Sequence, residues 1–148
     1  IIALIIFLIF NFRNKAIFFS GDIGSISLGF FLSFIILSLI VNTQNIKWIL
    51  LLGVYGLDSV GTIVLRIIRK ENIFKAHRTH LYQYLTNNIN MSHQFVSFIY
   101  CFIQLLLNAI IIFMDNLIVI FTYMLTIFFY ILIRLNYEGR KKLFKKYY

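Results

Sequence analysis

An aspartate flanked by glycines lies where a short basic loop meets a long apolar segment. The segment 11–29 contains the run Gly21-Asp22-Ile23-Gly24-Ser25. A carboxylate here suits Mg²⁺, which binds one or two protein carboxylates and takes its other ligands from water and phosphates. Gly21 and Gly24 would let phosphates approach the backbone, and Ser25 adds a donor. An aspartate before a helix also caps free backbone N–H groups, so a structural role stays open.

A second polar cluster lies in the segment 66–94. It holds Arg66 and Arg69 and then the runs His77-Arg78-Thr79-His80 and Tyr82-Gln83. On a helix, the two histidines would share one face. Histidine and arginine donors suit the diphosphate of a nucleotide-activated substrate. A solvated basic loop that only sets membrane topology uses the same residue types. A zinc site is a weaker option, because no third ligand is near in sequence.

Several polar residues interrupt the apolar segments themselves. Asp58 lies inside one of them, where a carboxylate is costly and faces protein or water. We interpret it as a structural partner for a polar group on a neighbouring helix. Gln104 and Asn108 are four residues apart, so they predict hydrogen bonds between helices. His93 follows Ser92 and alone carries little weight.

The composition indicates a membrane protein. Of 148 residues, 61% are hydrophobic, whereas soluble domains are about 45–50% apolar. The net charge of +9 could suggest nucleic acid, but no soluble domain is left to carry such a surface, so we predict no nucleic-acid partner. The charge instead suits a topology signal and attraction to anionic headgroups or phosphorylated substrates. The single Cys101 excludes a disulfide framework within the chain.

The apolar runs predict an all-α, polytopic bundle of transmembrane helices in a lipid bilayer. About 20 apolar residues cross the hydrocarbon core. Four segments reach that length and a fifth is partial; they are 23–41, 46–65, 95–113, 117–135 and the partial 1–10. The sequence starts inside an apolar run without a methionine. We therefore expect the chain to be the C-terminal part of one larger multi-pass membrane domain.

The positions of the basic residues predict the orientation. If the loop 11–22 is cytoplasmic, the loop 66–94 and the tail 136–148 lie on the same side. That side then holds every lysine and arginine of the 14 except Lys47, as expected for residues retained in the cytoplasm. Asp22 and the histidine loop would then face one compartment. The tail alternates basic and aromatic residues, which is typical of an interfacial anchor.

In their order, these motifs resemble the polyprenyl-phosphate N-acetylhexosamine-1-phosphate transferases, of the glycosyltransferase family 4 type. That superfamily includes phospho-N-acetylmuramoyl-pentapeptide transferase. The resemblance covers most of 11–93 and rests on short motifs at several places. They are Asn11-Phe12 before a basic loop, the Gly21–Ser25 run, Asp58 in a helix ending Leu65-Arg66, Glu71-Asn72-Ile73-Phe74, His77-Arg78-Thr79-His80-Leu81-Tyr82-Gln83 and Ser92-His93. The histidine motif resembles the branch that starts bacterial surface-polysaccharide and O-antigen synthesis.

The resemblance implies a reaction at the bacterial cytoplasmic (inner) membrane. A sugar-1-phosphate passes from a UDP-N-acetylhexosamine-type nucleotide sugar to a polyprenyl (undecaprenyl) phosphate, and UMP is released. It implies Mg²⁺, with Mn²⁺ as an alternative ion, and allows a homodimer. The implied catalytic residues are Asp22, which also binds the metal, and His77 and His80. The implied substrate-binding residues are Asn11, Gly21, Gly24, Ser25, Arg78 and Tyr82.

The sequence also departs from the family pattern. Lys15 stands where proline is common, and Ser20 stands where methionine is common. The family's adjacent aspartate pair and its motif rich in asparagine and aspartate are not in this chain, so we expect the chain alone to lack transferase activity. Two alternatives stay open. One is a small non-catalytic membrane protein in which Asp22 caps a helix, and the other is a transporter segment with Asp58 in an ion path.

Overall fold

The computed structural model describes residues 2–12, 21–75 and 77–138. These residues form helices and connecting loops, with no strand among them, so the predicted all-α class is confirmed. The helices in chain order are α1 (Ile2–Asn11), α2 (Gly21–Thr43), the 3₁₀ helix η1 (Ile46–Leu52), α3 (Gly53–Ile68), α4 (Leu81–Asn87), α5 (His93–Phe113) and α6 (Asn116–Glu138).

Four helical segments of the described chain are long and apolar enough to cross a membrane. They are Gly21–Thr43, Ile46–Ile68, His93–Phe113 and Asn116–Asn136. Their apolar side chains mostly point outward; Ile23, for example, is 86% exposed and Leu117 is 79% exposed. Large exposed apolar surfaces are rare on soluble proteins but suit contact with lipid. The chain is therefore a multi-pass membrane protein, as the sequence predicts.

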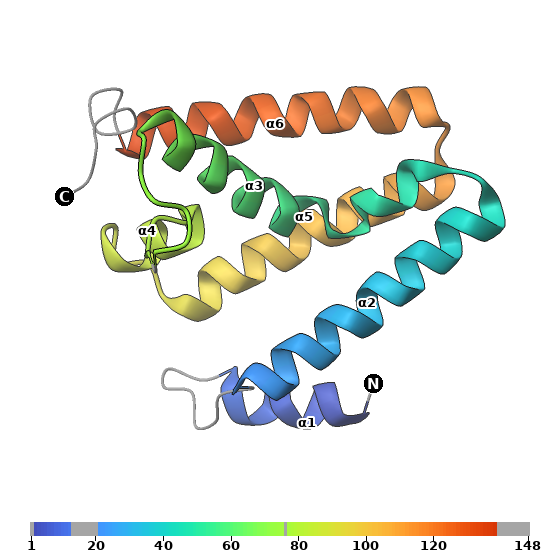
Figure 1. Cartoon of the computed structure of the whole chain (residues 1–148), viewed down its shortest axis with the longest axis horizontal. Helices are drawn as coiled ribbons and strands as arrows, with labels where there is room; N and C mark the ends of the chain where they lie inside the picture. Colours follow the sequence, from blue (N-terminus) through green and yellow to red (C-terminus); the bar gives the residue numbers. More distant parts are fainter. Residues whose placement is uncertain (1, 13–20, 76, 139–148) are drawn as a thin grey trace.

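The helices α3, α5 and α6 form a group, and α2 diverges from it (Figure 1). The contacts of α2 with this group run mainly through η1. The short α4 lies at the end of the bundle where α3 ends and α5 begins (Figure 1). A small apolar core lies near the opposite end, where residues from η1, α3, α5 and α6 meet. Its members are Leu107, Ile111, Val119 and Tyr123, packed against Trp48, Leu50, Leu51, Val54 and Ile110.

The predicted helix 46–65 corresponds to the helical span Ile46–Ile68, whose first part is the 3₁₀ helix η1. Side chains from neighbouring helices bind the backbone where η1 passes into α3. The hydroxyl of Tyr123 donates to the Leu50 carbonyl at 2.5 Å, and the Gln104 side-chain oxygen accepts from Val54 N at 2.8 Å. A Cβ on Gly53 would collide with the Tyr123 ring. The 3₁₀ helix thus passes into the α-helix where side chains of other helices hydrogen-bond to backbone C=O and N–H groups.

Gln104 also confirms one prediction made from spacing. Its bond to Val54 joins α5 to α3, and its other side-chain group hydrogen-bonds Asn108 at 2.7 Å. Gln104 therefore connects two helices inside the bundle, whereas its bond to Asn108 lies within α5. Such contacts stabilise helix association in membranes by about 1 kcal/mol.

The other helix boundaries differ from the predictions by a few residues. α2 begins at Gly21, so Asp22 lies in its first turn rather than before it. Gly21 has φ +60, a left-handed conformation that favours glycine. α5 begins at His93 because the Ser92 hydroxyl accepts from Phe95 N at 3.2 Å and caps the helix. α6 extends to Glu138, and α4 lies inside the segment that was predicted to be a loop.

Candidate functional site

The Asp58 carboxylate joins α3 to three other elements of the bundle. Asp58 is 3% exposed. It accepts hydrogen bonds from Leu81 N at 2.8 Å and Tyr82 N at 3.4 Å, both at the start of α4. It also accepts from the hydroxyls of Tyr100 on α5, at 3.1 Å, and Tyr130 on α6, at 3.2 Å. This geometry agrees with the structural interpretation of Asp58, because a buried carboxylate is tolerated when donors surround it.

Arg134 forms a second buried connection from α6. It is 2% exposed. Its Nη1 donates to the hydroxyls of Thr62, at 3.1 Å, and Tyr130, at 2.6 Å, and its Nη2 donates to the Thr79 carbonyl at 2.5 Å. Arg134 therefore links α3, α6 and the loop before α4. Sequence reasoning placed it among the topology signals at a helix edge and missed this contact. No local sequence pattern predicts these contacts, since Thr62 and Thr79 lie far from Arg134 in sequence.

Arg66 organises the first half of the same loop. Its guanidinium donates to Glu71 at 3.2 Å and to the carbonyls of Asn72 at 2.5 Å, Ile73 at 3.3 Å and Lys75 at 3.1 Å. The buried Arg69 also lies 3.9 Å from the Glu71 carboxylate. From the sequence, these two arginines suit either a topology signal or an anion site. In the structure both are buried and interact with acceptors of the loop itself. Arg78, by contrast, is exposed.

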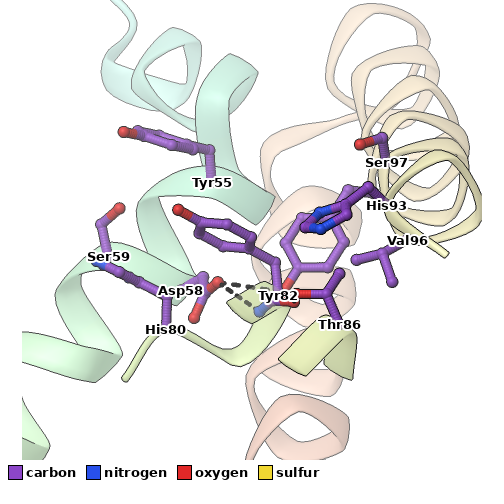
Figure 2. A pocket seen from close by; sticks show the side chains of 10 residues that line it. Tyr55, Asp58, Ser59, His80, Tyr82, Thr86, His93, Val96 and Ser97 are labelled. Carbon is purple, nitrogen blue, oxygen red and sulfur yellow. Dashed lines mark hydrogen bonds between the residues drawn. The ribbon is translucent and has the colours of Figure 1, made fainter. Parts of the chain in front are cut away.

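A pocket of about 310 Å³ lies beside the Asp58 carboxylate. Figure 2 shows Asp58, Ser59 and His80 on one side of it and His93 and Val96 on the other. Its volume lies at the lower end of the range for small-molecule sites, about 300–1,000 Å³. The lining combines aromatic, hydroxyl and imidazole groups from α3, α4, α5 and the loop before α4. Its remaining members are Tyr55, Tyr82, Thr86, Ser97 and Tyr100.

The two loop histidines lie together, although neither is inside a helix. His77 and His80 precede α4, and their ring centroids are 5.0 Å apart. The His80 ring stacks on Tyr82 at 5.7 Å. His80 is also the N-cap of α4, where its side chain and that of Gln83 form a capping box. Burial lowers the pKa of His77 below 6.5, and the charges of Arg66 and His80 add to this effect. The lowered pKa favours the neutral form of the His77 imidazole at pH 7.

His93 lines the pocket at the first turn of α5. In the sequence, its position after Ser92 in a short motif is the available signal for this role. Tyr82 is 40% exposed and also borders the pocket. Burial raises the pKa of the Tyr82 hydroxyl, and the Asp58 carboxylate raises it further, so this group stays protonated at neutral pH.

Asp22 does not line this pocket. It is exposed in the first turn of α2, and the Ser25 hydroxyl donates to the carbonyls of Gly21 at 3.0 Å and Asp22 at 3.2 Å. Gly24 lies in the same turn. No cluster of three or more His, Cys, Asp or Glu side chains suited to a metal occurs in the described part of the chain. One exposed carboxylate still matches Mg²⁺ chemistry, since the ion takes other ligands from water and phosphates.

Asn11 lies at the end of α1 and lines a second pocket, with Phe12, Ser97 and Cys101 among its neighbours. Ser97 borders the first pocket as well. The Gln94 side chain also donates to the Phe12 carbonyl at 3.2 Å, which fixes the end of α1 against the start of α5. Asn11 and His93 thus flank the same end of α5, while Asp22 lines neither pocket.

No protein-family model matches the chain, and neither a curated protein nor a solved structure shows significant similarity to it.

Proposed function

We propose that this protein takes part in the transfer of a sugar-1-phosphate from a UDP-N-acetylhexosamine to a polyprenyl phosphate, with release of UMP, at the cytoplasmic face of a bacterial inner membrane. One observation carries the proposal. His80, Tyr82 and His93, which belong to two separate motifs, border one pocket at the end of an apolar helix bundle. A membrane lipid phosphate and a soluble nucleotide sugar can meet only near such an end.

The proposed chemistry follows from the groups around the pocket. An oxygen of the polyprenyl phosphate attacks the β-phosphorus of the UDP-sugar, and the bond from this phosphorus to the bridging oxygen breaks. UMP leaves with the bridging oxygen. Phosphoryl transfer depends mainly on in-line positioning and charge stabilisation. His77, Arg78 and His80 supply donors for the diphosphate, and the half-exposed ring of Tyr82 supplies an aromatic face.

Asp22 would hold Mg²⁺ from the start of α2. When bound, the ion would neutralise charge on the phosphate oxygens. The exposure of Asp22 supports this assignment, because the ion's remaining ligands come from solvent and substrate. The aspartate motifs that accompany this residue in the resembled family would complete the site.

Substrate binding can be tested on the purified protein in lipid nanodiscs, with labelled UDP-N-acetylglucosamine and UDP-N-acetylgalactosamine as probes. We expect Arg78→Gln and His80→Gln to weaken binding about tenfold or more, because hydrogen bonds to charged groups contribute about 1.5–3 kcal/mol each. Asp115→Asn is the control, since Asp115 is exposed on the short turn between α5 and α6. Equal affinity in all variants would show that Arg78 and His80 do not contribute to substrate binding.

Turnover is tested by UMP release from membranes that contain the protein expressed from its complete open reading frame. Asp22→Asn keeps the size of the side chain and removes its charge. We expect it to abolish UMP release while the amount of inserted protein stays constant. An Asp22→Asn protein that turns over at the normal rate would exclude Asp22 from the reaction.

The surroundings of Asp58 favour this proposal over a transporter segment. An acid in an ion path needs access to water, whereas Asp58 is 3% exposed. Its carboxylate accepts hydrogen bonds from the backbone N–H groups of Leu81 and Tyr82 and from the hydroxyls of Thr62, Tyr100 and Tyr130. The geometry therefore suits a fixed structural carboxylate.

A further inference from the structure

The backbone on both sides of His80 is attached to buried side chains of the membrane-spanning helices. Before His80, the Thr79 carbonyl accepts from Arg134 at 2.5 Å. After it, the Leu81 N–H donates to Asp58 at 2.8 Å. Asp58 and Arg134 are 3% and 2% exposed, so both contacts are shielded from water. Hydrogen bonds to charged groups are among the strongest in proteins.

We infer that Asp58 and Arg134 are positioning residues for His80: together they fix the loop so that its imidazole borders the pocket. Neither residue carries the chemistry itself. The part of this inference that concerns nucleotide-sugar affinity rests on the proposed function, whereas the position of His80 does not.

The local structure around His80 makes such external fixation necessary. α4 has 7 residues, and isolated helices shorter than about 12–15 residues are marginal in water. Residues 77–79 have no regular secondary structure. The Asp58 carboxylate also accepts from Tyr82 N at 3.4 Å, so it takes up a second N–H group that the first turn of α4 leaves without a helical partner. The loop thus takes its position from α3 and α6.

The cost of these two charges supports a specific role. A charged residue inside a membrane helix opposes insertion, most strongly at the helix centre. A tyrosine or leucine pair would fill the same space at lower cost. Apolar side chains, however, cannot bind one carbonyl and two N–H groups of a polar loop at the membrane boundary. Charged groups of opposite sign, one an acceptor and one a donor, suit these two kinds of backbone partner.

The expected effect on nucleotide-sugar affinity depends on how much of the time the loop holds His80 in its binding arrangement. If the loop holds His80 in its binding arrangement only one-tenth of the time, the apparent Kd rises about tenfold. Asp58→Asn removes the negative charge and replaces one carboxylate oxygen by an NH₂ group. Because an NH₂ group cannot accept a hydrogen bond, the N–H of Leu81 or of Tyr82 loses its acceptor. Arg134→Lys keeps the charge but replaces the planar fork by one ammonium group, which cannot reproduce the bonds to Thr62, Tyr130 and Thr79 together.

The experiment records imidazole NMR signals of the full chain, labelled at histidine, in lipid nanodiscs. The sequence has 3 histidines, so His→Gln variants assign each signal. We expect Asp58→Asn and Arg134→Lys to shift or broaden the His80 signal and to raise the Kd for UDP-N-acetylglucosamine about tenfold or more. Two controls at the opposite end of the bundle should change neither. Asp115→Asn makes the same charge change as Asp58→Asn, and Lys47→Arg keeps the charge, as Arg134→Lys does. Tyr130→Phe removes one donor to Asp58 but neither backbone N–H, so it should lower stability without moving the His80 signal.

The outcomes separate the two proposals. A wild-type His80 signal in both Asp58→Asn and Arg134→Lys would overturn the positioning role, even if the variants were less stable. A shifted His80 signal in a protein that binds no nucleotide sugar would support positioning and count against the proposed function. If Asp58→Asn fails to fold, Arg134→Lys decides, because it keeps the buried charge.

Discussion

The hydroxyl of Tyr130 lies 3.2 Å from the Asp58 carboxylate, although 72 residues separate the two in sequence. The same hydroxyl accepts from Arg134 at 2.6 Å. Tyr130 thus lies between an acid and a base that come from different membrane-spanning helices. A neutral hydroxyl that donates to one and accepts from the other satisfies hydrogen-bonding groups of both away from water.

Tyr130→Phe removes this bridging hydroxyl while keeping the aromatic ring. We expect the free energy of unfolding in detergent to fall by about 1 kcal/mol, as for other hydrogen bonds between membrane helices. Tyr55→Phe is the control, because Tyr55 is 70% exposed and surface changes are usually within about 0.5 kcal/mol. Equal losses in both variants would contradict a specific contribution of the Tyr130 hydroxyl.

Gly53→Ala tests the passage from η1 to α3. The new methyl group would collide with the Tyr123 ring, and overpacking of this kind costs about 1–3 kcal/mol. Gly56→Ala is a matched control on the same helix, since a Cβ there meets nothing within 4 Å. Its higher helix propensity should leave stability unchanged or slightly raised. Thermal unfolding of both variants in one detergent measures the difference, and a Gly53→Ala protein as stable as Gly56→Ala would contradict the collision.

The environment of His77 predicts that the stability of the fold depends on pH below pH 6.5. Its pKa is lowered by burial and by the charges of Arg66 and His80, so the unfolded state binds the proton more readily than the folded state. Stability is therefore fully present above pH 6.5 and is lost as the pH falls through the range below it. Imidazole NMR titration should show His77 titrating below 6.5, and His77→Gln should remove this contribution to the acid loss of stability. A His77 titration at or above 6.5 would contradict the assigned cause.

Arg66→Lys tests the organisation of the loop before α4. Lysine cannot keep all the bonds that Arg66 makes to Glu71 and to the carbonyls of residues 72, 73 and 75. We expect a loss of about 2 kcal/mol from buried groups left without partners, and faster tryptic cleavage after Arg78. Lys75→Arg is the control, because its side chain is exposed and trypsin still recognises it. An unchanged cleavage rate in Arg66→Lys would mean that the loop is fixed by other contacts.

The long helices could be predicted from sequence because hydrophobic length is a local property. The structural role of Asp58 and the interhelical role of Gln104 could also be predicted, since a polar group inside a membrane span needs a polar partner. The 3₁₀ helix could not, because its cause lies in side chains of α5 and α6 that meet the backbone around Gly53. α4 was missed because a helix of 7 residues has no measurable apolar period.

The candidate site was predictable as a set of residue types but not as an arrangement. The sequence indicated His77 and His80, whose rings do lie together. Residue type alone does not distinguish the loop arginines, because nothing local shows that Arg66 folds back onto carbonyls whereas Arg78 stays exposed. Arg134 is the clearest case. Its partners become visible only when α6 packs beside α3.

The distance in sequence between Asp58 and its partners also has a consequence in time. A ribosome adds about 5–20 residues per second, so the 72 residues from Asp58 to Tyr130 take about 4–14 s to make. During that interval α3 holds its acid without the hydroxyl and the guanidinium that α6 will bring. Until then the donors available to Asp58 come from α3, α4 and α5. The contacts with α6 are therefore the last part of this buried network to form.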